Sequence, residues 1–142
     1  MFSARMVYAL LALIELAAVH ETGTLVQVAA ISRRHGIADR YLEQMLTALR
    51  KGGYLTSVRG ARGGYQLSRS PELITVAEVE ECLNGEGRRE RKVVRDSPEQ
   101  QVIEELAQRA DRARASVLRS ISLAKLLTEC DSHRQPGLMF HI

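Results

Sequence analysis

The most constraining feature of the sequence is a pair of short helical segments that are separated by a glycine turn and followed by a glycine-rich hairpin. Apolar residues at helical spacing predict helices over residues 26–35 and 39–51, and Gly36 permits the sharp turn between them. Asp39 opens the second helix, where a carboxylate suits the exposed amides and the helix dipole, and the two glycines after residue 51 end it. The pattern is that of a helix–turn–helix.

Two short strands are predicted directly after this pair, over residues 54–59 and 65–68. The segment between them reads Gly-Ala-Arg-Gly-Gly, and its glycines allow positive φ angles in a tight hairpin. A β-hairpin that follows a helix–turn–helix is a wing. Aromatic residues make up 4% of the chain, so a core of Leu, Ile, Val and Ala favours helix elsewhere. The expected fold is mainly α with a small two-stranded β wing.

Two further helices complete this predicted domain. The first covers residues 4–20, with Ser3 as its N-cap, and the fourth covers residues 76–83, with Thr75 as its cap. The inward residues expected in the first helix are Val7, Leu10, Leu11, Ile14 and Ala17. Those expected in the fourth are Val76, Val79 and Leu83.

A long helix is predicted near the end of the chain, over residues 98–120. Ser97, Pro98 and Gln100 form a strong helix start with a capping box. At ~1.5 Å per residue this helix would be roughly 35 Å long, and a short helix over 123–129 follows it. Its apolar line consists of Val102, Ile103, Leu106, Ala110, Ala113, Val117 and Ile121. One small domain cannot cover this line, so we expect it to be the dimer interface of a homodimer.

These segments define the expected organisation of the chain. It has a winged-helix domain over 1–84, a charged linker over 85–97, dimerisation helices over 98–130 and a tail over 131–142. Residues 1–71 carry nine Lys or Arg against four Asp or Glu, whereas residues 72–142 carry eleven against thirteen. The basic excess of the first half indicates a polyanion partner, with chance as the alternative.

The polar face of the helix over 39–51 is the candidate recognition surface. Its outward residues are Arg40, Glu43, Gln44, Thr47 and Arg50, which suit base edges and phosphates. In the hairpin, Arg59 and Arg62 flank Gly60, where they can enter a narrow minor groove. The alternatives are an ordinary solvated helix face and a hairpin tip that arginine keeps soluble. The two features together favour double-stranded DNA as the partner.

Other classes of protein find little support. The four histidines are scattered, and the sequence has no nucleophile elbow, P-loop or dinucleotide fingerprint, so an enzyme is not expected. Glu15 interrupts the apolar run over 7–19, which predicts neither a membrane span nor a signal peptide, and a cytoplasmic protein is expected. Cys82 and Cys130 are too few and too far apart for a disulfide framework.

Several segments resemble the Rrf2-type transcription regulators, the family of the IscR, NsrR and CymR regulators. The matching stretches are GIADRYLEQML (36–46), LRKGG (49–53), SVRGARGGYQL (57–67) and, outside them, YAL (8–10), IT (74–75) and LRSISL (118–123). The resemblance covers residues 1–127. It implies a winged-helix domain, a long helix that crosses its partner in a homodimer, and binding to palindromic operators.

The resemblance also implies particular contacts. Tyr41, Glu43 and Gln44 would belong to the recognition helix, Arg59 would lie near the minor groove, and Ser3 and Arg5 would lie near phosphates. The rest of the wing motif consists of Gly60, Gly63, Gly64 and Tyr65, which we include in the candidate DNA-binding surface.

Two departures from the family pattern stand out. The family wing usually reads Pro-Gly after its first glycine, whereas this chain has Ala61 and Arg62. Many members hold an iron–sulfur cluster through three linker cysteines, whereas residues 85–97 contain none. Because cluster iron is held mostly by thiolates, we expect no cofactor and no metal. A thiol switch at Cys130 stays open, as do a solvated loop and an anionic partner for the basic linker.

The function predicted from the sequence is a homodimeric DNA-binding regulator without a cluster. Two rivals remain. One is a CymR-like regulator that answers to a regulatory protein or a small-molecule effector. The other is a protein–protein adaptor that keeps the wing without binding specific DNA.

Overall fold

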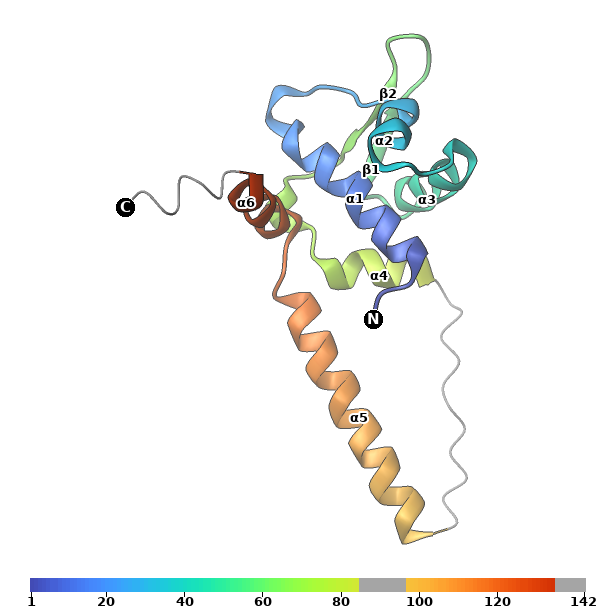
Figure 1. The fold of residues 1–142 in the computed structure, drawn as a ribbon, viewed down its shortest axis with the longest axis vertical. Coiled ribbons are helices and arrows are strands. Elements are labelled where there is room, and N and C mark those ends of the chain that lie inside the picture. The colour runs from blue at the N-terminus through green and yellow to red at the C-terminus, as the bar shows by residue number, and fades with distance from the viewer. Residues whose placement is uncertain (85–96, 135–142) are drawn as a thin grey trace, which may run out of the picture.

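A helical body with one long helix extending from it makes up the structure, a computed structural model that describes residues 1–84 and 97–134 (Figure 1). The expected fold class, mainly α with a two-stranded sheet, is confirmed. Residues 85–96 of the predicted linker and residues 135–142 of the predicted tail lie outside the described residues. The body contains α1 (Ala4–Ala18), η1 (His20–Thr22), α2 (Val28–His35), α3 (Asp39–Lys51), β1 (Leu55–Val58), β2 (Gly64–Leu67), η2 (Pro71–Leu73) and α4 (Val76–Asn84).

Helix α1 runs diagonally through the middle of the body (Figure 1). Its predicted cap is confirmed, because the Ser3 hydroxyl accepts a hydrogen bond from the Met6 amide at 3.2 Å. Its predicted inward face is confirmed in part. Ala17 is buried, and Leu10 and Leu11 are half-buried and pack against the core, whereas Ile14 is half-buried and Val7 is exposed. The other buried residues are Met6, Ala9, Ala12, Leu13 and Leu16. The small alanines allow close approach of the neighbouring elements.

The helix–turn–helix forms as expected. Helix α3 has the predicted bounds, and the four residues predicted to be buried, Leu42, Met45, Leu46 and Leu49, are all buried. The turn before it uses Gly36 with a φ of 66°. Helix α2 begins two residues later than predicted, because Val26 pairs with Tyr65 of β2 in an isolated β-bridge.

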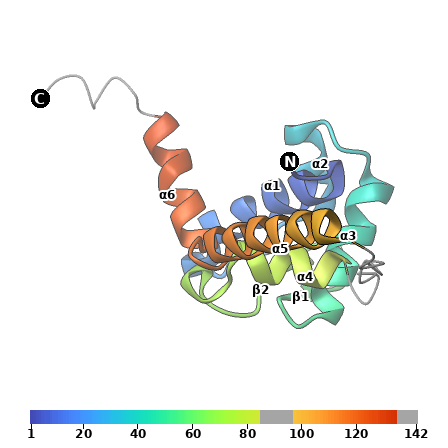
Figure 2. The ribbon, with the colours of Figure 1, turned by 90° about the horizontal axis from the view of Figure 1, so that it is seen from below.

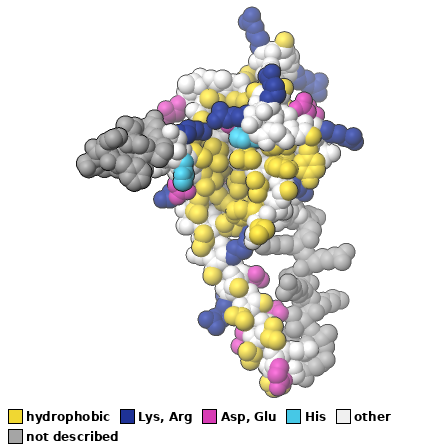
Figure 3. Space-filling view, viewed as in Figure 1, with side chains coloured by type: hydrophobic (Ala, Val, Ile, Leu, Met, Phe, Trp, Pro, Cys, Tyr) yellow, Lys and Arg dark blue, Asp and Glu magenta, His cyan; other side chains and the backbone are white. Residues whose placement is uncertain are grey.

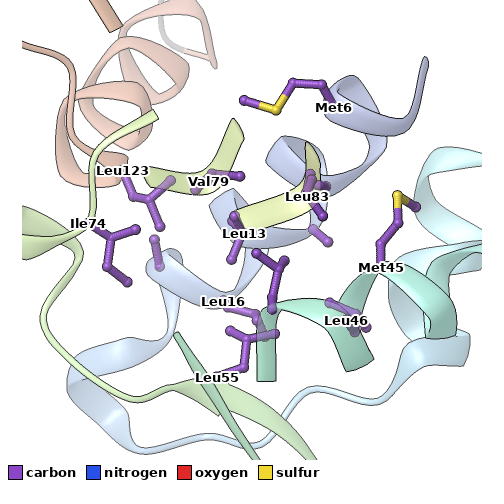
Figure 4. Close-up of a cluster of buried hydrophobic side chains, with 14 of the residues drawn as sticks. Met6, Leu13, Leu16, Met45, Leu46, Leu55, Ile74, Val79, Leu83 and Leu123 are labelled. Atoms are coloured by element: carbon purple, nitrogen blue, oxygen red, sulfur yellow. The ribbon is translucent and has the colours of Figure 1, made fainter. Parts of the chain in front are cut away.

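The core lies between α1, α3, α4 and the strands (Figure 4). It contains twenty buried apolar residues among those described, and eighteen of them precede residue 84. The largest are leucines such as Leu13, Leu16 and Leu46. Each fully buried leucine contributes about 1.5–3 kcal/mol relative to an exposed one, so this cluster is the main source of stability for the body.

Helix α4 starts with a reciprocal capping box. The Glu78 amide donates to the Thr75 hydroxyl and the Thr75 amide donates to the Glu78 carboxylate, both at 3.2 Å. The predicted cap of α4, Thr75, is therefore confirmed. Val76, Val79 and Leu83 are buried, as predicted.

Two helices lie in the second described range, 97–134: α5 (Pro98–Arg119) and α6 (Leu123–Arg134). The predicted cap of α5 is confirmed, because the Gln100 amide donates to the Ser97 hydroxyl at 3.2 Å. Helix α6 extends beyond its predicted end at 129. Its polar last turns are exposed, so apolar spacing gives no signal for them. Helix α5 contacts α4 and extends away from the rest of the body (Figure 1), and Figure 2 shows α6 projecting to one side.

The chain between α5 and α6 returns to the body through a short backbone pairing. The Val76 amide donates to the Ile121 carbonyl and the Leu123 amide donates to the Ile74 carbonyl, both at 2.9 Å. Leu123 is fully buried, and α6 packs against α1 and η2. This pairing fixes the C-terminal end of α5 to the entry of α4.

Most of the predicted apolar line of α5 is exposed in the single chain. Val102, Ile103, Leu106 and Val117 are 56–65% exposed, and the two alanines of the line are exposed as well. Ile121 differs, because it packs partly against the core. Apolar side chains lie along this helix and in a larger area over the body (Figure 3). None of the described helices is both apolar enough and long enough to span a bilayer.

Candidate nucleic-acid interface

Helix α3 separates its buried and polar residues cleanly. Arg40, Glu43, Gln44 and Arg50 are exposed, and Thr47 is half-buried beside them. The opposite side carries the four apolar residues that enter the core. Because packing holds this helix rigidly from one side, the polar side chains are presented on a fixed frame.

Tyr41 lies in the first turn of α3 and is 47% exposed. Its ring stands edge-on to the ring of Tyr8, with centroids 6.0 Å apart and planes at 85°. Tyr8 comes from α1 and is half-buried. The aromatic pair therefore ties the start of the candidate recognition helix to α1.

The wing is the hairpin formed by β1, β2 and the loop between them, and its tip is residues 59–62. The strands are antiparallel, with Leu55 opposite Leu67 and Val58 opposite Gly64. The tip is exposed, and the Gly63 amide donates to the Gly60 carbonyl at 3.0 Å. Gly60 has a φ of 108°, a conformation that favours glycine.

Two glycines of the wing motif build the hairpin by close approach. Gly63 is buried, and a Cβ atom there would lie 1.9 Å from the Val58 carbonyl oxygen. A Cβ atom on Gly64 would lie 2.7 Å from the Val26 carbonyl oxygen. The structure thus gives both glycines a part in shaping the hairpin, and their contact with DNA stays a prediction.

The wing is attached to the start of α2. Tyr65 and Val26 exchange two backbone hydrogen bonds, at 2.9 and 2.8 Å. Further out, Gln27 Nε2 donates to the Ala61 carbonyl at 2.8 Å and so reaches the tip itself. No sequence pattern predicts this contact, because the two residues are 34 positions apart and Gln27 lies outside the wing motif that contains Ala61.

The C-terminal end of α3 is joined to the base of the wing through Gly53. Its carbonyl accepts hydrogen bonds from Ser68 Oγ at 2.5 Å and from Arg69 Nη2 at 3.2 Å. The Arg69 guanidinium also lies over the Tyr54 ring, 5.0 Å from its centroid.

Helix α4 also contacts this end of α3. The Tyr54 hydroxyl donates to Glu78 at 3.4 Å, and burial together with the charge of Glu78 raises the pKa of Tyr54. Cys82 Sγ lies against Gly52, where an added Cβ would come within 2.5 Å of it. Burial raises the pKa of the Cys82 thiol, and the charge of Arg5 opposes this shift. Helix α3, the base of the wing and α4 therefore meet around Gly52, Tyr54 and Cys82.

The candidate contact arginines have no ion-pair partner among the described residues. The described arginines that lie within 4 Å of a carboxylate are Arg34, Arg114 and Arg134. The candidate DNA contacts Arg40, Arg50, Arg59 and Arg62 are not among them. Arg34 donates to Glu15 at 2.8 Å, and His35 contacts the same carboxylate at 3.0 Å. Basic side chains stand out around the upper part of the body (Figure 3). Charges without a partner leave positive potential available to an anionic ligand.

Ser3 and Arg5 lie at the N-terminal end of α1. The Ser3 hydroxyl is already engaged in capping α1, whereas Arg5 is exposed. This end of α1 lies near the start of α3, because Tyr8 contacts Tyr41 one turn further along. The structure thus brings Arg5 near the candidate recognition helix, and a phosphate contact stays a prediction.

The donor set of this chain does not fit an iron–sulfur cluster. The whole sequence contains two cysteines, and Cys82 lies on α4 whereas Cys130 lies on α6. No group of three or more His, Cys, Asp or Glu residues that could hold a metal occurs within residues 1–84 and 97–134. Clusters are held mostly by four thiolates, so two separated thiols are insufficient.

Comparisons with known proteins agree with this geometry. The model of the Rrf2 family, described as an iron-dependent transcriptional regulator, matches residues 2–129. The transcriptional regulator IscR of Cereibacter sphaeroides is 43% identical over 77 residues, which are 54% of this chain and 50% of that protein. This chain spans about half the length of the curated relatives it matches first.

Two solved structures cover nearly the whole chain. CymR, the global cysteine regulator of B. subtilis, has a TM-score of 0.79 and 30% identity, covering 91% of this chain and 97% of that one. IscR of T. potens has a TM-score of 0.75 and 31% identity, covering 92% and 88%. The family match extends over most of the chain, and these folds share its winged helix. The chain therefore belongs to the Rrf2 family of transcriptional regulators.

Proposed function

We propose that this protein is a sequence-specific DNA-binding regulator that acts as a homodimer on palindromic operators and carries no iron–sulfur cluster. The observation that carries the proposal is the arrangement of α3 and the wing. The polar face of α3 and the arginines of the wing tip are exposed, lack ion-pair partners among the described residues, and belong to one connected unit.

The recognition helix and the wing would read DNA in different ways. Glu43 can accept from the cytosine amino group and Gln44 can pair with adenine, so α3 would enter the major groove. Arg59 and Arg62 at the wing tip would enter the adjacent minor groove, where the potential is most negative. The phosphate contacts would come from Arg5, Arg40 and Arg50, with Ser3, Tyr41 and Thr47 beside them.

The exposed line of α5 supports the dimer. A helix of 22 residues with one buried residue, Leu118, leaves its apolar side chains in water unless a second surface covers them. A second copy supplies an identical line, and a two-fold axis would make the contact self-complementary. Two recognition helices would then stand about 34–36 Å apart, or a multiple of it, and meet successive major grooves.

A binding titration tests the DNA-binding part of this proposal. A promoter duplex selected by the wild-type protein is titrated by fluorescence anisotropy at two salt concentrations. Gln44→Ala should cost about 1–3 kcal/mol of binding free energy and relax the preference at one base pair. Arg50→Ala should weaken binding to all sequences alike and lower by about one the slope of log binding constant against log salt concentration. Arg112→Ala, on the exposed part of α5, is the matched control. A protein that prefers no sequence would be an adaptor and would refute the proposal.

The oligomeric state tests the dimer. Sedimentation of Leu106→Asp should show a monomer at concentrations where the wild type is a dimer, because a carboxylate would be buried in an apolar interface. Gln108→Asp, an exposed polar position on the same helix, should leave the dimer unchanged. A wild-type protein that sediments as a monomer would contradict this part.

A regulator that answers to a partner protein or a small effector is the second candidate. The cysteine content favours it over cluster sensing, because the chain lacks the thiolates that a cluster needs. Iron analysis after anaerobic purification decides between them. A colourless protein without iron agrees with the proposal, and a brown protein containing iron and sulfide contradicts it.

A further inference from the structure

The side chain of Gln27 connects the start of α2 to the tip of the wing. Its Nε2 atom donates to the Ala61 carbonyl at 2.8 Å across 34 residues of sequence. Ala61 stands between the two arginines of the tip. A hydrogen bond at this place restrains the backbone that carries Arg59 and Arg62.

The side chain of Gln27 makes no capping contribution to its own helix. Gln27 is the N-cap residue of α2, yet no capping hydrogen bond forms from its side chain to that helix. The side chain is exposed, so it does not fill the core either. Its contact in the structure is the carbonyl of the wing tip.

The tip has little other restraint. It contains no proline, so no ring fixes a φ angle between residues 59 and 64. The strands end at Val58 and Gly64, and the tip beyond them has the Gly63 to Gly60 hydrogen bond as its internal contact. The Val26–Tyr65 bridge holds the base of the wing and not its tip.

We infer that Gln27 is a positioning residue for minor-groove recognition, which fixes the wing tip relative to the helix–turn–helix. The inference rests on the proposed function, because it assumes that the wing arginines contact DNA. Gln27 holds the arginine-bearing loop at one distance from α3, so that one approach to the duplex places both elements in their grooves. Loss of this bond leaves the arginines present but less well ordered, and binding then includes the entropic loss of ordering them.

The first experiment needs no DNA. Amide hydrogen exchange in the free protein should be faster at Gly63 in Gln27→Leu than in the wild type, because the tip opens more often. Gln66→Ala is the matched control, a glutamine on β2 with no side-chain hydrogen bond shown among the described residues. Unchanged exchange at the tip would overturn the inference, whatever the outcome with DNA.

The second experiment is a double-mutant cycle with a duplex that the wild-type protein selects from a random pool. Gln27→Leu should weaken binding about three- to tenfold, the range of one net hydrogen bond. The same change in an Arg59→Ala, Arg62→Ala background should have less than about a twofold effect, since the side chains that Gln27 positions are gone. An equal loss in both backgrounds would mean that Gln27 contacts DNA directly, and would overturn the inference.

Sequence preference gives a third readout that a merely structural role would not change. Gln27→Leu should relax selection at the base pairs under the wing and leave selection under α3 intact. Uniform relaxation at both places would contradict the inference. If the wild type selects no sequence, the proposed function fails, and the exchange measurement still decides whether Gln27 holds the tip.

Discussion

The body and helix α5 are built from the same kinds of residue but differ in what surrounds them. Eighteen buried apolar residues lie between Met6 and Leu83, whereas α5 buries Leu118 within its 22 residues. The body encloses an apolar core and presents polar and basic groups on α3 and the wing, together with an apolar area on one face (Figure 3). Helix α5 presents apolar groups to solvent and has acidic and basic residues beside them.

This difference shows that the two regions obtain their order from different sources. The recognition helix is held by four buried side chains beneath its polar face, so its geometry is set within one chain. Helix α5 is held in one chain by its N-cap, by contacts with α4 and by the backbone pairing after residue 119. The remaining apolar surface of α5 is available to a second copy. In the proposed homodimer, folding and assembly would therefore depend on separate parts of the sequence.

Truncating one leucine to alanine in each region should give the largest difference in the free energy of unfolding. Leu46→Ala should lower the free energy of unfolding by about 2–5 kcal/mol, because Leu46 is fully buried on α3. Leu106→Ala should lower it by less than about 0.5 kcal/mol at concentrations where the protein is monomeric, since Leu106 is 59% exposed. Urea denaturation measures both. Equal losses in the dilute protein would mean that the two regions form one core.

A pair of capping variants sharpens the comparison at a smaller scale. Thr75→Ala removes the capping box of α4 and should lower the global free energy of unfolding by about 0.5–2 kcal/mol. Ser97→Ala removes the cap of α5 and should instead increase amide exchange in the first turn of α5, with an unchanged urea midpoint. A shifted midpoint for Ser97→Ala would show that α5 unfolds together with the body.

The ion pair between the two regions should contribute less. Arg114 of α5 donates to both carboxylate oxygens of Glu80 on α4, each at 2.5 Å. Because the Arg114 side chain is 40% exposed, Arg114→Gln should lower stability by about 0.2–1 kcal/mol, and added salt should reduce that difference. Arg112→Gln, exposed on the same helix, is the control. A loss that salt does not reduce would contradict a screened ion pair.

The smallest effect concerns pH and lies wholly within the body. Burial raises the pKa of the Cys82 thiol above its ordinary value of 9.0, so the unfolded chain ionises first as the pH rises. The contribution of Cys82 to stability is therefore present below that ordinary value and is lost as the pH rises through the pKa of the folded state. Cys82→Ser should show a shallower alkaline loss of stability in urea denaturation than the wild type. Parallel pH profiles for wild type and Cys82→Ser would contradict this assignment.

The sequence predicted the bounds and the buried face of α3 well because its signals agree. Four large apolar residues at helical spacing, an acidic start and two glycines at the end leave one solution for residues 39–51, and the structure has these bounds. The wing was predicted from its glycines, although β1 is shorter than predicted and β2 begins and ends one residue earlier. The DNA contacts assigned to both elements stay predictions.

The inward face of α1 could be predicted only in part from the same kind of pattern. This helix is apolar on almost every side, so its periodicity has no single phase, and the prediction followed the larger side chains. Ala9 and Ala12 are buried instead, because packing selected the face that permits close approach. The Gln27 contact depends on where two distant segments meet, which no local pattern records.

The pairing of Ile74 with Leu123 also has a consequence for synthesis. Leu123 fills a fully buried place in the core, yet it is made 49 positions after Ile74. At about 5–20 residues per second on the ribosome, that interval lasts roughly 2–10 s. Throughout it, the Leu123 side chain is not yet present to fill its place in the core. The helix–turn–helix and the wing are therefore synthesised several seconds before the residue that completes their core.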